Sequence, residues 1–160
     1  MVNVSLGRND NERTVLKLIR AMEAGTLEQA AAELCSPEFV WANSGLDTIY
    51  GKEHLFRHLA SGGFGKQVSI LKNMTHFSAD ILNLATNGDI VFTERIDHHW
   101  DASGRDLMTP HICGVSKVVD GKILYFRDFY DVICYEQQPG EPNPEFELTS
   151  FRNAQRALVK

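Results

Sequence analysis

Long hydrophobic runs are missing from this sequence of 160 residues. No uninterrupted apolar stretch exceeds four residues, whereas a transmembrane helix needs about 20. Residues 1–10 also lack the apolar core of a signal peptide. These absences exclude a membrane-spanning helix and lead us to expect a soluble protein in the cytoplasm, with no membrane as a partner.

Cysteine and clustered basic residues are also scarce. The three cysteines, Cys35, Cys113 and Cys134, lie far apart and form no CxxC pair, which disfavours a zinc site or a redox dithiol. The 16 basic and 21 acidic side chains give a formal charge of −5, and phosphate neutralisation needs clustered lysine and arginine. We therefore expect no metal site and no nucleic-acid partner.

The sequence does have an ordinary globular composition, with 43% hydrophobic and 23% charged residues, and its length suits one domain. In the first third, apolar residues recur at helical spacing in three segments. This pattern predicts helices over 10–22, 26–34 and 51–59, with a short strand over 39–43 between the second and the third.

Beyond residue 68 the hydrophobic period changes to two, which predicts strands. The expected strands cover 68–77, 81–84, 89–100, 107–119 and 122–130, and glycine-containing turns separate the longer ones. Helices followed by a strand meander predict an α+β fold, in which helices pack on one side of a curved antiparallel sheet. We expect one domain over 1–136, and an acidic, proline-rich linker and tail over 137–160.

Polar residues occupy strand faces that the hydrophobic pattern assigns to the interior. Asp128 shares a face with Phe126, and Arg95 and Asp97 share a face because they are two residues apart. Asn43 ends the inward face of the short strand. A carboxylate buried alone costs several kcal/mol, so these side chains are expected to find partners in one another.

The lengths of two hairpin loops predict how these faces align. A two-residue turn at 120–121 and a three-residue loop at 102–104 place His111 opposite both Arg95 and Tyr130. They likewise place Cys113 opposite both Thr93 and Asp128. The residues that then point inward are Arg95, Asp97, His111, Cys113 and Asp128. A two-residue loop at 102–104 would instead turn Arg95 and Asp97 outward, because one step of register reverses every side chain.

An arginine between two aspartates in an apolar site is suited to proton transfer. The arginine stays charged and holds one aspartate ionised, while burial keeps the second protonated, so one acts as base and the other as acid. The alternative is that these pairs are structural clips within the sheet. A metal site is disfavoured because His98 and His99 point to opposite faces, and His54 and His58 lack the context of a zinc motif.

Two segments carry a resemblance to a known family. Thr93-Glu94-Arg95-Ile96-Asp97, followed by Gly121-Lys122-Ile123 and then Arg127-Asp128-Phe129-Tyr130-Asp131, resembles the limonene-1,2-epoxide hydrolase family. The layout is similar over about 10–136, and the likeness is dense over 89–131. It implies a cone-shaped, cystatin-like (NTF2-like) α+β fold, shared with ketosteroid isomerases and SnoaL-like polyketide cyclases, and a homodimer.

The resemblance also implies roles for individual residues. Asp97 matches the general acid, Arg95 the bridging arginine, Asp128 the base and Asn43 a residue that holds the attacking water. Trp41 stands where the family has a water-holding tyrosine, and an indole N–H donates a hydrogen bond but cannot accept one. Tyr130 or Tyr50 is a substitute for that tyrosine, and His111 is a further candidate for the binding site.

Three functions remain open on this basis. The leading hypothesis is a cofactor-free epoxide hydrolase that acts on an apolar small molecule. The second is an isomerase or polyketide-type cyclase, in which Asp128 or His111 removes a proton next to a carbonyl. The third is a small-molecule binding domain without catalysis. A diol product, carbonyl-dependent proton exchange, or tight binding without turnover separates the three.

Overall fold

The computed structural model describes residues 1–136. The predicted linker and tail over 137–160 lie outside the described residues. The α-helices are α1 (Asp10–Glu23), α2 (Leu27–Leu34) and α3 (Lys52–Ala60), and the strands are β1 (Cys35–Asn43), β2 (Ile49–Tyr50), β3 (Met74–Asn87), β4 (Ile90–Asp101), β5 (His111–Val119) and β6 (Lys122–Phe129). Short 3-10 turns cover Val4–Leu6, Gly63–Lys66, Ser69–Asn73 and Val132–Glu136.

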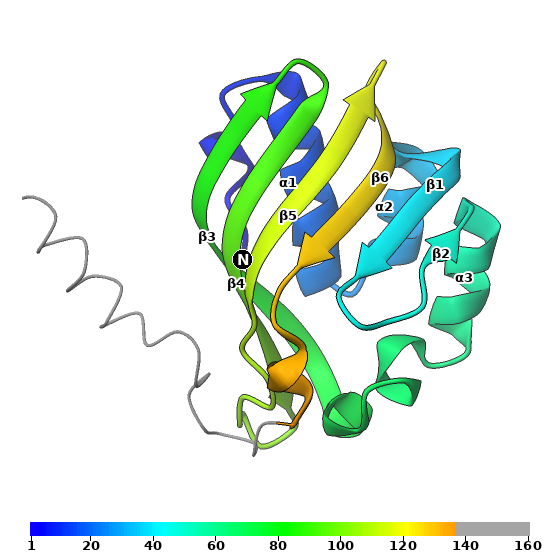
Figure 1. The fold of residues 1–160 in the computed structure, drawn as a ribbon, viewed down its shortest axis with the longest axis vertical. Helices are drawn as coiled ribbons and strands as arrows, with labels where there is room; N and C mark the ends of the chain where they lie inside the picture. The colour runs from blue at the N-terminus through cyan, green and yellow to red at the C-terminus, as the bar shows by residue number, and fades with distance from the viewer. Residues whose placement is uncertain (137–160) are drawn as a thin grey trace, which may run out of the picture.

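The six strands form one sheet in the order β2-β1-β6-β5-β4-β3 (Figure 1). From β3 to β6 the strands form an antiparallel meander, as predicted. The prediction of a wholly antiparallel sheet is wrong, because β1 runs parallel to β6. After β2 and α3 the chain moves to the far edge of the sheet at β3, and the meander then returns β6 beside β1 in the same direction.

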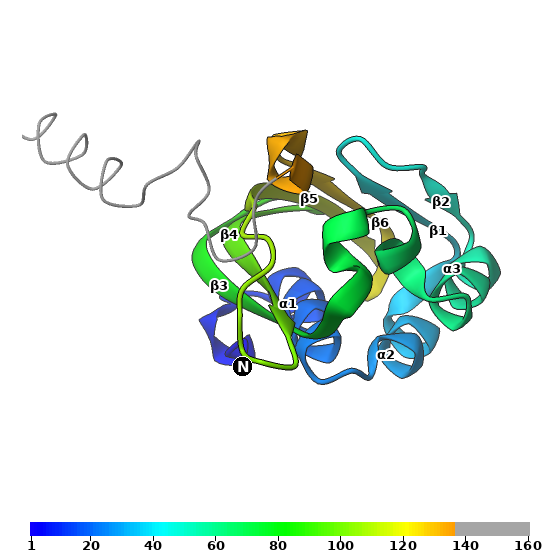
Figure 2. The same ribbon diagram turned by 90° about the horizontal axis from the view of Figure 1, so that it is seen from below.

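The helices cover one face of this sheet, which confirms the α+β fold. Seen from below, the sheet curves and the three helices lie on its concave side (Figure 2). In α1 the apolar face predicted from spacing is buried against the sheet, with Val15, Leu18 and Ile19 at most 1% exposed. No helix in the part of the chain that the structure describes is long and apolar enough to cross a membrane.

The bounds of some strands differ from the predicted ones. Residues 69–73 form a 3-10 turn, and the two strands predicted over 68–84 are the single strand β3. Strand β5 begins at His111 instead of residue 107, since Pro110 just before it has no N–H to donate to the ladder. Its carbonyl still accepts a hydrogen bond from the Asp97 N–H at 3.1 Å.

The loop at 102–104 has the predicted length, because the Asp101 N–H donates to the Arg105 carbonyl. An extra residue then enters the segment before β5. The Leu107 N–H donates to the His99 carbonyl, whereas His111 pairs with Ile96. From 107 to 111 the chain advances four residues, but from 99 to 96 on β4 it advances only three, so the segment before β5 holds one extra residue. A second extra residue lies in β6, where Val118 pairs with Ile123 but Lys117 pairs with Tyr125.

These two irregularities correct the predicted faces of β5. Thr93, Gly114 and Asp128 are aligned across the three strands, where the loop lengths predict Cys113 in the middle. His111 and Cys113 therefore lie on the outer face, and His111 contacts the Glu94 carboxylate there at 3.0 Å. Asp128 keeps its predicted inward orientation, because the extra residue before β5 and the extra residue in β6 compensate for each other between β4 and β6.

Candidate active site

Arg95 is held between two aspartates on the inner face of the sheet. Its Nε donates to Asp97 Oδ1 at 2.8 Å, and its Nη2 donates to Asp97 Oδ2 at 3.2 Å. The same Nη2 donates to Asp128 Oδ2 at 2.6 Å. Asp97 is the next inward residue on β4, whereas Asp128 lies on β6, two strands away. The arginine therefore reaches across β5 and joins the two carboxylates into one cluster, the Asp97–Arg95–Asp128 triad.

Gly114 makes this crossing possible. It is the β5 residue between Thr93 and Asp128. A Cβ atom at this position would lie 2.3 Å from Thr93 Oγ1, 2.6 Å from Arg95 Nη1 and 3.1 Å from Asp128 Oδ1. Any larger residue would therefore occupy the space through which the guanidinium passes. Sequence reasoning missed Gly114, because its importance depends on the two register shifts.

All three charged groups of the triad are buried, with exposures of 1% for Arg95 and 5% for each aspartate. Burial disfavours the charged arginine, but Asp128 and Asp97 outweigh it and raise the pKa of the guanidinium. Burial raises the pKa of Asp128 to about 6, against the pull of Arg95, and it also raises the pKa of Asp97. One arginine and two carboxylates become neutral when they share one proton, the state that a buried site favours.

Neighbouring side chains fix the guanidinium in place. Arg95 Nη1 donates to Thr93 Oγ1 at 3.2 Å, and the Phe126 ring lies 5.3 Å from Arg95 Cζ. The guanidinium is thus held by hydrogen bonds in its own plane and by the Phe126 ring, so its orientation is fixed. A bidentate arginine held in this way is geometrically rigid, which a lysine ammonium would not reproduce.

Asn43 lies beside Asp128 on the neighbouring strand, since β1 pairs with β6 at these two residues. The Tyr130 hydroxyl lies 3.4 Å from Asn43 Oδ1 and 2.6 Å from the Tyr135 hydroxyl. Tyr135 donates its own proton to the Ser44 carbonyl at 2.7 Å. Tyr130 therefore donates to Tyr135. Tyr130 thus lies beside Asn43, and its hydroxyl hydrogen is donated to Tyr135 and not to a bound water.

Trp41 is the next inward residue of β1 and pairs with Phe126. It is 6% exposed, and its ring packs edge-on against Phe64 and Phe126 at centroid distances of 5.2 and 6.2 Å. Within residues 1–136, the buried atoms without a hydrogen-bond partner include Trp41 Nε1 and Asp128 Oδ1. A buried polar group left unpaired costs about 1–3 kcal/mol, so a donor and an acceptor here are available to a bound molecule.

The fold brings most of the predicted site residues together. Arg95, Asp97 and Asp128 are in contact, and Asn43, Trp41 and Tyr130 lie beside them on β1 and at the end of β6. His111 does not join them, because it lies on the outer face of β5. Tyr50 does not join them either, since it is 66% exposed on the edge strand β2. Sequence reasoning also missed His99 and Tyr135. His99 follows Asp97 on the inward face of β4, and the alternation of β4 could have identified it.

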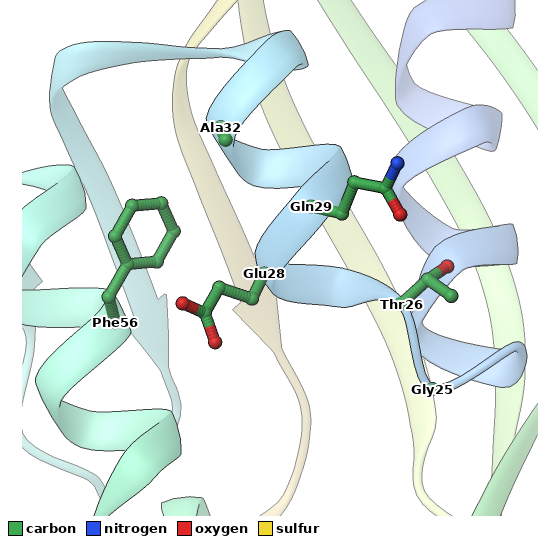
Figure 3. A pocket seen from close by; sticks show the side chains of 6 residues that line it. All are labelled: Gly25, Thr26, Glu28, Gln29, Ala32 and Phe56. Carbon is green, nitrogen blue, oxygen red and sulfur yellow. The ribbon is translucent and has the colours of Figure 1, made fainter.

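Hollows on the helical side of the molecule contain none of these residues. One lies between α2 and α3 and is lined by Gly25, Thr26, Glu28, Gln29, Ala32 and Phe56 (Figure 3). Another, at β2 and α3, includes Lys52, His54 and Arg57. Over the described residues 1–136, no group of histidine, cysteine, aspartate and glutamate side chains is arranged to hold a metal ion.

Comparison with solved structures defines the class of fold. An LEH-like epoxide hydrolase from M. tuberculosis aligns with a TM-score of 0.64 at 22% identity, over 79% of this chain and 86% of that chain. A SnoaL-like protein from Jannaschia sp. CCS1, named as a polyketide cyclase, aligns with a TM-score of 0.63 at 17% identity, over 84% and 94%. An NTF2-like protein of unknown function from Burkholderia pseudomallei K96243 aligns with a TM-score of 0.61 at 13% identity, over 77% and 92%.

The molecule therefore has the NTF2-like, SnoaL-like α+β cone. The family is defined more narrowly by the sequence: the model of the limonene-1,2-epoxide hydrolase catalytic domain matches residues 9–138. The chain belongs to this family, as the resemblance over 89–131 implies. No curated protein matches the chain.

Replacing Gly114 tests whether the crossing of Arg95 matters for function. Gly114→Ala is compatible with the extended backbone but displaces Arg95 from Asp128, and a displacement of about 1 Å can cost roughly a hundredfold in rate. We expect kcat/KM to fall by about that factor, with little change in the far-ultraviolet circular dichroism. The matched control is Ser116→Ala, which alters another buried, inward residue of β5. Equal activity in both variants would contradict the role of Gly114.

Proposed function

We propose that this protein is a cofactor-free epoxide hydrolase that adds water to the oxirane of a mostly apolar small molecule and releases a vicinal diol. The observation that carries this proposal is the buried Asp97–Arg95–Asp128 triad, in which one oxygen of Asp128 has no partner among the described residues. Membership of the limonene-1,2-epoxide hydrolase family supports it.

The base side of the reaction is assigned to Asp128. A water molecule donates one hydrogen to the unpaired Oδ1 of Asp128 and the other to the side-chain oxygen of Asn43. Trp41 Nε1 donates to one lone pair of this water, which leaves the second lone pair for the oxirane carbon. An indole in place of a tyrosine is thus compatible with water activation, because the water needs only a donor at this position.

The acid side of the reaction is assigned to Asp97. As the water oxygen bonds to the carbon, the carbon–oxygen bond of the oxirane breaks and the leaving oxygen takes the proton of Asp97. The water proton passes to Asp128 at the same time, so the triad gains one proton and loses one. Arg95 contacts both carboxylates throughout and balances the charge as it moves from Asp128 to Asp97. Proton exchange between the two then restores the starting state.

A second candidate function uses the same groups on a carbonyl compound. Asp128 would remove a proton next to the carbonyl in an isomerisation or an aldol-type cyclisation, and Trp41 Nε1 or protonated Asp97 would bind the carbonyl oxygen. The likeness to the SnoaL-like protein favours this alternative. His111 has no part in it, because it lies on the outer face of β5. The third candidate, a binding domain without turnover, predicts that the triad variants below change affinity only.

The source of the added oxygen tests the one-step mechanism. A single turnover of an epoxide in ¹⁸O-labelled water should place the label in the diol and leave Asp97 and Asp128 unlabelled, as mass spectrometry of the protein would show. Label in either carboxylate would indicate a covalent ester.

Asp97→Asn and Asp128→Asn should each lower kcat at least a hundredfold, and the double variant should be little worse. Asp101→Asn is the control, since Asp101 is also buried on β4 but, among residues 1–136, its carboxylate bonds only to Ser103 and Arg105.

The pH dependence of kcat/KM should rise through pH 6 and fall again at higher pH. Asp128 must be ionised to accept a proton, and its pKa is raised to about 6, so each pH unit below 6 should lower kcat/KM about tenfold. Asp97 must be protonated, and its pKa is also raised by burial, so its ionisation produces the alkaline limb. A rate that is constant between pH 4 and pH 7 would contradict the assignment of Asp128 as the base.

Two substitutions test the role of Trp41. Trp41→Phe removes the N–H and keeps most of the apolar wall, so we expect a loss of about 1–2 kcal/mol of transition-state stabilisation. Trp41→Tyr restores a donor and should retain or raise activity. If Trp41 only packs the core, Trp41→Phe will lower the thermal midpoint but leave turnover per folded molecule unchanged. A folded but inactive Trp41→Tyr would favour the cyclase or isomerase function.

A further inference from the structure

His99 continues the inward face of β4 one step beyond Asp97. Its side chain is nine-tenths buried, with 9% exposure, and the Phe77 ring packs edge-on against it at 5.5 Å between centroids. Its Nδ1 lies 2.8 Å from the carbonyl oxygen of Met108. The imidazole is thus held from two sides in an apolar part of the interior, close to the proposed acid.

The contact with Met108 determines which ring nitrogen carries the proton. A carbonyl oxygen can only accept, so His99 Nδ1–H is the donor, and in the neutral ring Nε2 then has a lone pair and no hydrogen. Burial lowers the pKa of His99 to about 4, so the ring is neutral at pH 7. Nε2 is therefore a fixed hydrogen-bond acceptor.

Within residues 1–136, the structure gives Nε2 of His99 no hydrogen-bond donor. Nε2 is not among the fully buried unpaired atoms of the described residues, which include Asp128 Oδ1, so it is accessible to a bound group and can accept a hydrogen bond from it. The base already uses its free oxygen for water in the proposed reaction. Nε2 of His99 is left for a donor on the substrate.

We propose that His99 Nε2 binds a hydroxyl or N–H group of the substrate, so that the preferred epoxide is an apolar molecule with one hydrogen-bond donor away from the oxirane. This inference rests on the proposed function, because it places the oxirane oxygen at Asp97. Residues two apart on a strand are separated by about 7 Å. The donor should therefore lie about that distance from the oxirane oxygen.

A matched pair of substrates tests this inference without any substitution. The probes are 5,6-epoxyhexan-1-ol and 1,2-epoxyhexane, which differ only in a terminal hydroxyl at a suitable distance from the oxirane. We expect the wild-type protein to prefer the hydroxylated epoxide roughly 3- to 10-fold in kcat/KM, the contribution of one hydrogen bond. Equal kcat/KM values for the two would overturn the proposal.

Two variants then locate the source of the preference. In His99→Asn the side-chain amide can still donate to Met108, as Nδ1–H does, but the acceptor at the position of Nε2 is lost. In His99→Gln the amide oxygen extends to the position of Nε2 and keeps an acceptor there. The preference should fall to about 1 in His99→Asn and be partly kept in His99→Gln. An unchanged preference in His99→Asn would place the donor contact elsewhere and overturn the proposal.

Binding of the products separates this inference from the proposed function. Calorimetric titration with hexane-1,2,6-triol and hexane-1,2-diol measures the same hydroxyl without catalysis, and thermal midpoints verify that the variants are folded. If the wild-type protein hydrolyses neither epoxide but binds the triol more tightly in a His99-dependent way, the hydrolase function fails and the His99 site stands. If it hydrolyses both epoxides equally and binds both products equally, the hydrolase function stands and the His99 site fails.

Discussion

The burial of one positive charge beneath the sheet determines the arrangement of this site. A guanidinium 1% exposed is tolerated only if opposite charges and hydrogen bonds replace its water. Asp97 and Asp128 do this from two strands that are not neighbours, so the arginine has to pass over the strand between them. That requirement in turn fixes a glycine on β5 and an aromatic ring, Phe126, against the guanidinium. The residues around Arg95 on the inner face are therefore those that allow its guanidinium to pair with both aspartates.

The fold was largely predictable from the sequence, because its signals are local. The helical spacing of 10–22 and the two-residue period beyond 68 depend on neighbours in the chain. The parallel pairing of β1 with β6 was not predictable in this way, because it depends on where the chain returns after a long excursion. The start of β5 was also misplaced, although Pro110 was a visible signal for a shorter strand.

The site was predicted only in part, because the loop lengths do not reveal the two register shifts in the sheet. Counting along the two hairpins correctly aligned Thr93 with Asp128, but it placed Cys113 between them, where the structure has Gly114. The two extra residues, one before β5 and one in β6, compensate for each other. His111 was therefore assigned to the wrong face while Asp128 was assigned to the right one. The position of a bulge of this kind leaves no mark in the loop lengths, so the sequence did not reveal it.

The parallel pairing of β1 with β6 has a consequence for how the site is assembled during folding. Arg95, Asp97 and Asp128 lie within one meander, so local hairpins suffice to bring the triad together. Trp41 and Asn43 reach Asp128 only when residues some 85 positions apart pair along the last seam of the sheet. Contacts of such separation form slowly, because a long loop must close first. We therefore expect the charged cluster to appear early in folding and the water-binding side to be completed last, so that only the complete six-stranded sheet has both.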